Sequence, residues 1–307
     1  YWRFESSPRN YMIAIAAVVL AAGEGTRMKS DLPKVLHPLA GRPMLGWVLE
    51  ALRGGGARRP CVVVGHQAGT VRRAFAGGAV NWVVQAVRRG TGDALACALR
   101  AMNGRGRVLV VCGDAPLVRP ETLRRLLAEH GRDRGRAATV LTALADDPAG
   151  YGRVIRGSDG RVARIVEDRD ATISERAVRE VNSGAYVFEG RPLRKALAEV
   201  RPDNAKGEYY LTDVVRLLGE SGERVGAWAA PGGEEEILGV NTRVELARAG
   251  GGLRRRVLER LMRGGVTVVD PGATYVDAGV RVGRDTTIWP NTHLRGKTVV
   301  GRGCVLG

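Results

Sequence analysis

The sequence predicts an α/β fold: a doubly wound, mostly parallel sheet, followed by the start of a parallel β-helix. Strand-like and helix-like segments alternate through the first two-thirds of the chain, which is typical of repeated β-α-β units. The segments Cys61–Val64 and Val108–Cys112 are continuous apolar runs, as expected of strands buried on both faces. Near the C-terminus an aliphatic residue recurs at every sixth position, which indicates stacked hexapeptide turns.

The first strand is the apolar run that ends at Ala22, and a loop with two glycines follows it. A helix over Pro43–Arg53 is predicted next, and three consecutive glycines end it. The remaining elements of this half are, in order, a strand at 61–64, a short helix at 71–75, a strand at 82–84, a helix at 93–102, a strand at 108–112 and a helix with Pro120 in its first turn. In such sheets the ligand lies beyond the carboxyl ends of the strands.

From Ala138 the pattern changes. Arg153–Ile155 and Val162–Val166 flank the turn signal Ser158-Asp159-Gly160, which predicts an inserted antiparallel hairpin that forms a lid or wall over the open end of the sheet. The later elements are, in order, a strand at 184–188, a helix at 193–200, a late edge strand at 225–229 and a connecting helix at 244–262 that is interrupted by Gly250-Gly251-Gly252.

The hexapeptide pattern consists of Val276, Val282, Ile288, Leu294, Val300 and Leu306. One such turn cannot bury its apolar face, so the turns must stack on each other. The alternative is chance spacing in a tail rich in glycine and valine. The predicted organisation is an N-terminal extension at 1–11, an α/β domain at 12–241, a linker helix at 242–263 and a truncated β-helix at 264–307.

The composition is that of a globular protein with a sizeable core, with 44% hydrophobic and 26% charged residues among 307. The formal net charge of +16 raises nucleic acid as a partner. Only five of the 48 basic residues are lysines, however, and the arginines are scattered through every segment. We therefore expect a solvated basic surface and no nucleic-acid partner.

The four cysteines show no C-x-x-C spacing and three of them stand in apolar stretches, which predicts free buried thiols and a cytoplasmic protein. The four histidines are dispersed, so no histidine metal site is expected. No run is long enough to cross a membrane. Tyr11–Ala22 resembles the apolar part of a secretory signal, but a glycine loop and an ordered α/β pattern follow it instead of a cleavage site.

The loop after the first strand is the first candidate site. Its glycines bring bare backbone N–H groups close to a ligand, and Arg27 and Lys34 add fixed positive charge, as expected for binding a nucleoside triphosphate. Two solvated surface cations are the alternative. Further on, the amide of Gln85 can read the imide edge of a pyrimidine with a paired donor and acceptor, and the Gly90-Thr91 turn offers backbone N–H groups. A helix N-terminus capped by Thr91 is compatible with the same residues.

Asp114 comes directly after the buried strand that ends at Cys112. A carboxylate at a strand end is well placed for Mg²⁺, which binds one or two protein oxygens together with substrate phosphates. The alternative for Asp114 is an ordinary turn former.

The string Leu20-Ala21-Ala22-Gly23-x-Gly25-Thr26-Arg27-Met28, followed by Leu32-Pro33-Lys34, resembles the signature of the sugar-nucleotide pyrophosphorylases. The strings around Gln85 and Gly90 and the hexapeptide tail narrow the resemblance to the bacterial bifunctional N-acetylglucosamine-1-phosphate uridyltransferases, over about residues 12 to 307. The resemblance implies a Rossmann-like nucleotide-diphospho-sugar transferase domain and a left-handed β-helix. One departure is Cys112, where many relatives carry an aromatic residue.

The resemblance also implies a role for each candidate residue. Leu20, Ala21, Ala22, Gly23, Gln85, Gly90 and Thr91 would bind the nucleotide, Gly152, Glu167, Asn182 and Asn241 the sugar, and Asp114 and Asn241 the metal, while Arg27 and Lys34 would be catalytic. A helix N-cap is the alternative for Asn241. The string Gly207–Asp213 is expected to shape the substrate pocket.

The reaction that the resemblance implies is transfer of UMP from UTP to N-acetylglucosamine 1-phosphate with Mg²⁺, giving a cell-envelope precursor and pyrophosphate. The acetyltransferase activity of the family lies in later β-helix turns, so none is expected here, and the trimer that the β-helix forms in the family is expected to be weakened. Two alternatives remain: another sugar-1-phosphate nucleotidyltransferase, of the glucose-1-phosphate uridylyl or thymidylyl type, and a basic scaffold protein without enzymatic activity.

Overall fold

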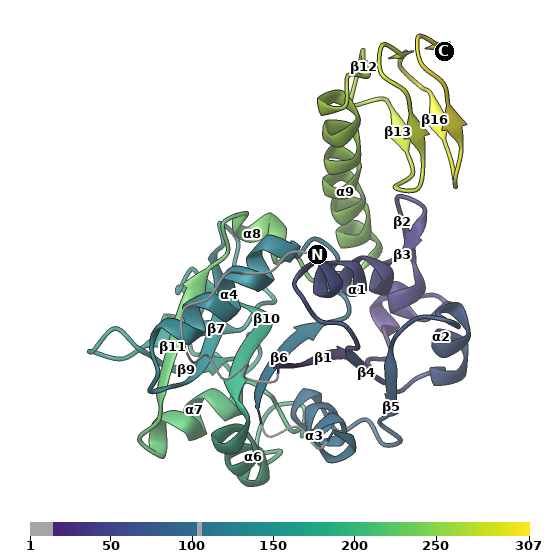
Figure 1. The fold of residues 1–307 in the computed structure, drawn as a ribbon. Coiled ribbons are helices and arrows are strands. Elements are labelled where there is room, and N and C mark those ends of the chain that lie inside the picture. The colour runs from purple at the N-terminus through teal and green to yellow at the C-terminus, as the bar shows by residue number, and fades with distance from the viewer. Residues whose placement is uncertain (1–14, 103–105) are drawn as a thin grey trace, which may run out of the picture.

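The structure is a computed structural model that describes residues 15–102 and 106–307. The expected extension at 1–11 and the start of the signal-like stretch lie outside the described residues. A layered α/β unit forms the larger part, and a long helix, α9, leads from it to a set of short stacked strands (Figure 1). The predicted fold class is confirmed, whereas the exact domain boundaries stay predictions.

The main sheet has the strand order β11-β7-β10-β6-β1-β4-β5. Its strands are β1 (Ile15–Ala21), β4 (Cys61–Val64), β5 (Asn81–Val84), β6 (Arg107–Cys112), β7 (Arg136–Leu144), β10 (Glu180–Glu189) and β11 (Arg224–Ala229). β1 pairs in parallel with β4 and β6, and only β10 runs antiparallel to its neighbours β6 and β7 along this path. The sheet is therefore mostly parallel, and β11 is an edge strand, as predicted.

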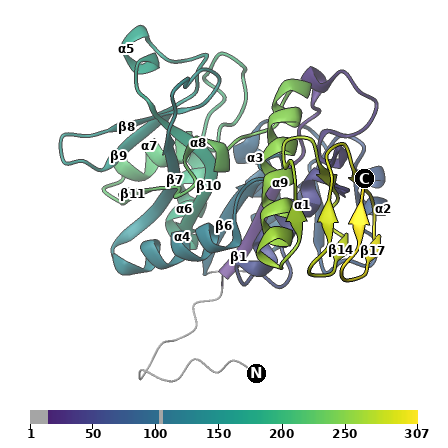
Figure 2. The same cartoon turned by 90° about the horizontal axis from the view of Figure 1, so that it is seen from above.

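Figure 1 shows helices on both faces of this sheet, and Figure 2 shows the same arrangement from above. They are α1 (Met44–Gly54), α2 (Ala68–Ala74), α3 (Thr91–Ala101), α4 (Pro120–Arg132), α6 (Gly190–Glu199) and α7 (Asp213–Glu220). Successive strand residues point to opposite faces, so Val18 packs with Leu95 of α3 and Leu193 of α6, whereas Val19 packs with Leu49 of α1 and Leu123 of α4. These two buried layers are the doubly wound core that the sequence predicts.

The inserted hairpin is also present. β8 (Arg153–Arg156) pairs antiparallel with β9 (Val162–Val166), and β8 joins the main sheet through β10. The sequence did not predict β7 or α7, and the short helices α5 (Ile173–Arg176) and α8 (Gly233–Glu236) were also missed. β7 was missed because its alanines and threonines do not form the apolar run that marks the other buried strands.

The predicted interruption of the connecting helix is wrong. α9 runs from Arg243 to Arg263 without a break and begins with a capping box between Thr242 and Glu245. A glycine costs a helix only about 1 kcal/mol relative to alanine, and packing of the flanking turns offsets this cost. Ala249 and Leu253 are fully buried, and a Cβ at Gly252 would lie 3.1 Å from Leu117 Cδ2, so the glycines allow close packing on the α/β unit.

The hexapeptide segment forms the predicted parallel β-helix. Its strands are β12 (Thr267–Val268), β13 (Tyr275–Val276), β14 (Arg281–Val282), β15 (Thr287–Ile288), β16 (His293–Leu294), β17 (Val299–Val300) and β18 (Val305–Leu306). Each hexapeptide residue pairs in parallel with the third one along: Val276 with Leu294, Val282 with Val300 and Ile288 with Leu306. Leu258 and Leu261 of α9 pack against this stack and close its first coil.

Three smaller elements lie between β1 and α1. They are the 3-10 helices η1 (Thr26–Met28) and η2 (Lys34–Leu36) and a hairpin of β2 (Pro38–Leu39) and β3 (Arg42–Pro43). The four cysteines are free, as predicted, but only Cys61 is buried. None of the helices in the described part of the chain has the length and apolar character needed to cross a bilayer.

Candidate active site

The candidate residues gather at the carboxyl edge of the main sheet. β1 ends at Ala21 and its parallel neighbour β6 ends at Cys112, so the loops that follow these strands begin side by side. The loop after β5 starts at the same edge, because β5 pairs in parallel with β4 and β4 with β1. This is the edge at which ligands bind in doubly wound sheets.

The loop after β1 is held open toward solvent. Gly23 has free space around it, and Gly25 has a left-handed backbone with a φ of 70°. A Cβ at Gly25 would lie 2.6 Å from Lys34 Cβ, so only glycine lets the loop lie directly against Lys34. Arg27 is exposed on η1, and Nε of Arg243 donates to the carbonyl of Met28 over 3.1 Å. α9 thus fixes the far end of this loop.

Three predicted residues are in direct contact. Nζ of Lys34 donates to Asp114 Oδ2 and, over 3.1 Å, to Asn241 Oδ1. The backbone also joins the two acceptors, because Val240 N–H donates to the carbonyl of Asp114 over 2.8 Å. The N-cap of α9 is Thr242, so the alternative role of Asn241 as that cap is wrong. Asp114 forms an ion pair with Lys34, 80 positions away in the sequence, and a residue that only forms a turn would not need this contact.

The same residues fit a magnesium ion. One ammonium group contacts a carboxylate oxygen and an amide oxygen, so two hard oxygen donors converge on a point that already attracts positive charge. Among the described residues no three His, Cys, Asp or Glu side chains form a metal-binding group. A metal held here by these two protein oxygens would complete its shell with water and phosphate oxygens, as Mg²⁺ commonly does.

Gln85 lies at the end of β5 and is only 3% exposed. Its Nε2 donates to the carbonyl of Gly90 over 3.1 Å and to Asp93 Oδ2 over 2.7 Å. Both amide hydrogens are therefore bonded within the protein. The prediction that Gln85 would both donate to and accept from a pyrimidine base does not match this arrangement. The amide oxygen is the part of Gln85 that can accept a hydrogen bond from an imide N–H.

The turn at Gly90 is built against a distant segment. Gly90 has a φ of 108°, and a Cβ there would lie 2.6 Å from the carbonyl oxygen of Tyr209. Thr91 does not cap α3, because the N-cap is Gly90 and the Thr91 hydroxyl accepts from Leu211 N–H over 3.0 Å. The string that contains Tyr209 and Leu211 therefore forms one wall of the candidate base site, consistent with its predicted role in shaping the pocket.

The candidate sugar residues come from the inserted hairpin and β10. Asn182 N–H donates to the carbonyl of Gly152 over 2.8 Å, so these two predicted residues are neighbours. Asn182 Nδ2 donates to Tyr186 Oη over 2.7 Å, and its Oδ1 accepts from Gly184 N–H over 3.0 Å. The side chain keeps one amide hydrogen and one lone pair for a ligand.

Glu167 follows β9 and accepts a hydrogen bond from Thr212 Oγ1 over 3.0 Å. Burial raises the pKa of the Glu167 carboxyl, and the hydrogen bond from Thr212 partly opposes this rise. A desolvated carboxylate of this kind is a strong acceptor for ligand hydroxyl groups.

We expect Glu167→Gln to stabilise the free protein at neutral pH. A carboxyl whose pKa is raised in the folded state destabilises the fold where it is ionised, and this cost disappears as the pH falls through the raised value. The melting temperature of the variant should therefore exceed that of the wild type at pH 7, and the two should converge on acidification. A wild type that melts higher than the variant at pH 7 would contradict this.

Two contacts that hold the candidate sugar residues in place were not predicted from the sequence. Thr212 orients Glu167, and Arg153, which is only 2% exposed, donates to Asp168 Oδ1 over 2.8 Å and to the carbonyl of Tyr151. Arg153 thereby joins the segments that carry Gly152 and Glu167. Its place directly after Gly152 was a signal, but the partner Asp168 could be found only in the fold.

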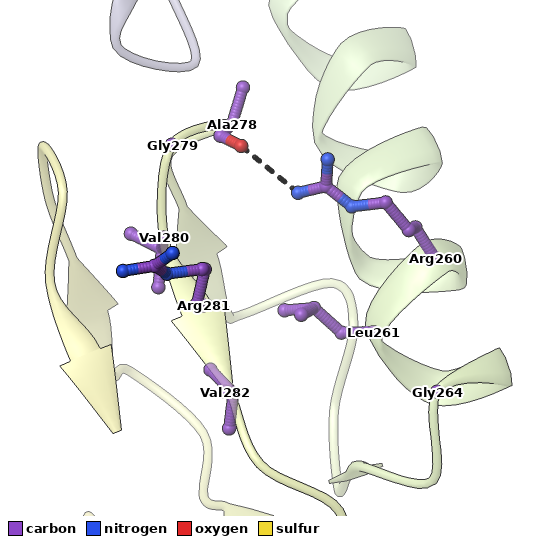
Figure 3. A pocket seen from close by; sticks show the side chains of 8 residues that line it. All are labelled: Arg260, Leu261, Gly264, Ala278, Gly279, Val280, Arg281 and Val282. Carbon is purple, nitrogen blue, oxygen red and sulfur yellow. Dashed lines mark hydrogen bonds between the residues drawn. The ribbon is translucent and has the colours of Figure 1, made fainter. Parts of the chain in front are cut away.

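A separate cavity of about 300 Å³ lies between α9 and the first β-helix coil (Figure 3). Leu261, Val280 and Val282 form part of its wall, and Arg260 donates to the carbonyl of Ala278 over 3.0 Å. None of the candidate site residues lines this cavity. The cavity therefore belongs to the junction with the β-helix.

Comparison with protein families matches residues 17–208 to the MobA-like NTP transferase domain. Over 294 residues the chain is 53% identical to the protein of Geobacter metallireducens named "Bifunctional protein GlmU", covering 95% of this chain and 61% of that protein. The protein of the same name from Caldanaerobacter subterraneus subsp. tengcongensis is 46% identical over 296 residues, which are 96% of this chain and 64% of that protein. The chain thus spans less than two-thirds of these relatives.

Among solved structures, one of a UDP-glucose pyrophosphorylase complexed with UDP-glucose superposes with a TM-score of 0.65. The match covers 80% of this chain and all of that chain, at 17% sequence identity. This likeness shows a shared fold.

Proposed function

Since the chain belongs to the MobA-like NTP transferase family and is homologous over 95% of its length to a bifunctional GlmU protein, we propose that it transfers UMP from UTP to N-acetylglucosamine 1-phosphate. The products are UDP-N-acetylglucosamine, a precursor of cell-envelope polymers, and pyrophosphate. The observation that carries this proposal is the convergence of Lys34, Asp114 and Asn241 at the carboxyl edge of the sheet.

The proposed step is an in-line displacement at phosphorus. A phosphate oxygen of N-acetylglucosamine 1-phosphate attacks the α-phosphorus of UTP, a new P–O bond forms, and the bond to the bridging oxygen of the β-phosphate breaks. The nucleophile is already an anion, so no general base is required. The protein therefore acts by positioning the two substrates and by stabilising the negative charge on the departing pyrophosphate.

The chain's own residues divide these tasks. Lys34 brings a nearly buried ammonium group, 11% exposed, to the place where the phosphates would lie, and the exposed Arg27 can fold over the same phosphates from η1. Gln85 accepts from the uracil imide, while Glu167 and Asn182 orient the sugar. Two anionic substrates are thereby held against fixed positive charge.

We propose Mg²⁺ as the cofactor, with Asp114 and Asn241 as its protein ligands. When bound, it supplies additional positive charge to the phosphate oxygens of UTP. Asp114 and Asn241 are kept in place without it, because their backbones are linked through Val240 and Asn241 N–H donates to Glu245 Oε2 over 2.6 Å.

The rival function is that of another sugar-1-phosphate nucleotidyltransferase, which would share the phosphate loop and differ in the base and sugar contacts. We expect UTP to be used faster than ATP, CTP or GTP with N-acetylglucosamine 1-phosphate, because Gln85 presents an acceptor to an imide donor that cytosine lacks. Pyrophosphate release across the four triphosphates measures this. Equal rates with ATP and UTP would contradict the assigned base site.

We also propose that the reaction takes place in the cytoplasm and that the β-helix mediates trimer formation. The free cysteines are consistent with a reducing compartment, and the match to the Geobacter metallireducens protein covers 95% of this chain. Sedimentation equilibrium measures the assembly state, and a monomer at all concentrations would contradict the trimer.

A further inference from the structure

The β2–β3 hairpin joins the α/β unit to the β-helix. It projects toward the first β-helix coil, below β13 in Figure 1. Both tip residues have left-handed backbone, with a φ of 45° at Ala40 and 77° at Gly41. The tip is in direct contact with the coil, because Ala278 N–H donates to the carbonyl of Ala40 over 2.9 Å.

Gly41 and Asp277 form the closest part of this contact. A Cβ at position 41 would lie 2.5 Å from Asp277 Cγ, so glycine is required both by the backbone and by the space. Asp277 is itself fixed by the second coil: its Oδ2 accepts from Gly296 N–H over 2.7 Å, and its own N–H donates to the carbonyl of Leu294 over 2.9 Å. The stacking of the β-helix therefore sets the surface on which the hairpin rests.

The hairpin is also tied to Lys34, which begins η2 directly before it. His37 Nδ1 bonds to the carbonyl of Lys34 over 3.0 Å, and Met44 N–H donates to the carbonyl of His37 over 3.0 Å, closing the base of the hairpin. Trp47 Nε1 donates to the carbonyl of Leu39 over 2.8 Å. Hydrogen bonds at Lys34, His37 and Leu39 thus hold the segment between Lys34 and the tip.

The hairpin packs in one buried cluster with the segments that flank Asp114 and Asn241. Leu39 of the hairpin packs in it with Leu117, three residues after Asp114, and with Val240, directly before Asn241. Ala249 and Leu253 of α9 complete the cluster. Lys34, Asp114 and Asn241 are therefore each close in sequence to a segment that packs in this cluster or in the hairpin. The hairpin in turn contacts the β-helix.

From this geometry we propose that docking of the Ala40–Gly41 tip on Asp277 positions Lys34, so that Gly41 and Asp277 are positioning residues for the transferase site. The β-helix then contributes to the chemistry of the α/β unit through this contact. The inference rests on the proposed function for its kinetic consequence, but the position of Lys34 can be measured without it.

The test compares Gly41→Ala with Gly222→Ala. Gly222 has a φ of 81°, close to that of Gly41, but has nothing within 4 Å of a new Cβ, so it imposes a similar backbone strain without a contact. Acetic anhydride labelling followed by mass spectrometry reports the accessibility of Lys34, with the exposed Lys29 as an internal reference. Pyrophosphate release reports kcat and KM, and all assays are run well below the melting temperature of each variant.

We expect Gly41→Ala to raise Lys34 labelling relative to Lys29 and to lower kcat by about tenfold or more, because displacement of a catalytic group by about 1 Å can cost on the order of 10²-fold. The KM for the sugar phosphate should stay near the wild-type value, since β8, β9 and β10 form that site. Gly222→Ala should change neither quantity. Wild-type labelling and kcat in a folded Gly41→Ala protein would overturn the proposal.

A second variant covers the case in which Gly41→Ala does not fold. Asp277→Ala leaves the hairpin backbone untouched and removes the surface on which Gly41 rests, so it should raise Lys34 labelling in the same direction. Unchanged labelling in this variant would likewise overturn the proposal. If the wild type releases no pyrophosphate, the proposed function fails, and the labelling result alone decides whether the hairpin positions Lys34.

Discussion

Asp114→Ala is expected to lower kcat/KM for UDP-N-acetylglucosamine formation by on the order of 10³-fold or more, because a bound metal contributes several kcal/mol to stabilising phosphoryl charge and each 1.36 kcal/mol is a factor of ten. Asp114 is the one carboxylate that contacts Lys34 and lies beside Asn241 in the described site. Pyrophosphate release at several Mg²⁺ concentrations measures the effect.

The control is Asp146→Ala, which removes a fully exposed carboxylate paired only with a surface arginine, Arg179. It should retain wild-type kinetics, because exposed ion pairs contribute about 1 kcal/mol or less. Asp114→Asn keeps the size of the side chain and an acceptor for Lys34 but removes the negative charge. A large loss of kcat/KM in this variant as well would show that the charge of Asp114 is needed, and not only its packing. Wild-type turnover by Asp114→Ala would refute the metal-ligand assignment.

Lys34→Gln is expected to lower kcat by about 10²- to 10³-fold, the range found when one preorganised charge-stabilising donor is removed from an active site. The Lys34 ammonium is mostly buried and fixed by two acceptors, so it is preorganised before substrate binds. The KM for N-acetylglucosamine 1-phosphate should change little, since Glu167 and Asn182 form a separate site.

Lys195→Gln provides the matched control, because Lys195 is exposed on α6 and is not one of the candidate site residues. Lys34→Arg should recover part of the lost rate by restoring the charge. A Lys34→Gln protein with normal kcat and only a raised KM would mean that Lys34 binds substrate without stabilising the departing pyrophosphate.

Much of this site could be predicted because it depends on strand ends. Cys61–Val64 and Val108–Cys112 are clear apolar runs, so Asp114 and the glycine loop could be placed at one edge of a parallel sheet. The hexapeptide period likewise predicted stacked parallel turns, and the pairing of Val276 with Leu294 is one of their contacts. These signals are local or strictly periodic, and a single sequence carries them.

The features that could not be predicted depend on contacts between distant segments. Lys34 and Asn241 meet across 207 positions of the chain, and no spacing rule links them. α9 continues through its glycines because Gly252 packs against Leu117, which helix propensity alone does not reveal. The internal use of the Gln85 amide hydrogens also follows only from the position of Asp93 in the fold.

The most direct test of the proposed activity is steady-state pyrophosphate release from UTP and Mg²⁺, with N-acetylglucosamine 1-phosphate compared with glucose 1-phosphate. We predict that kcat/KM is at least about tenfold higher with the N-acetylated sugar. Glucose 1-phosphate lacks the acetamido group, so polar groups of the sugar site would be left without hydrogen-bond partners. Equal or faster turnover of glucose 1-phosphate, or no pyrophosphate with either sugar, would contradict the assignment of this chain as an N-acetylglucosamine-1-phosphate uridyltransferase.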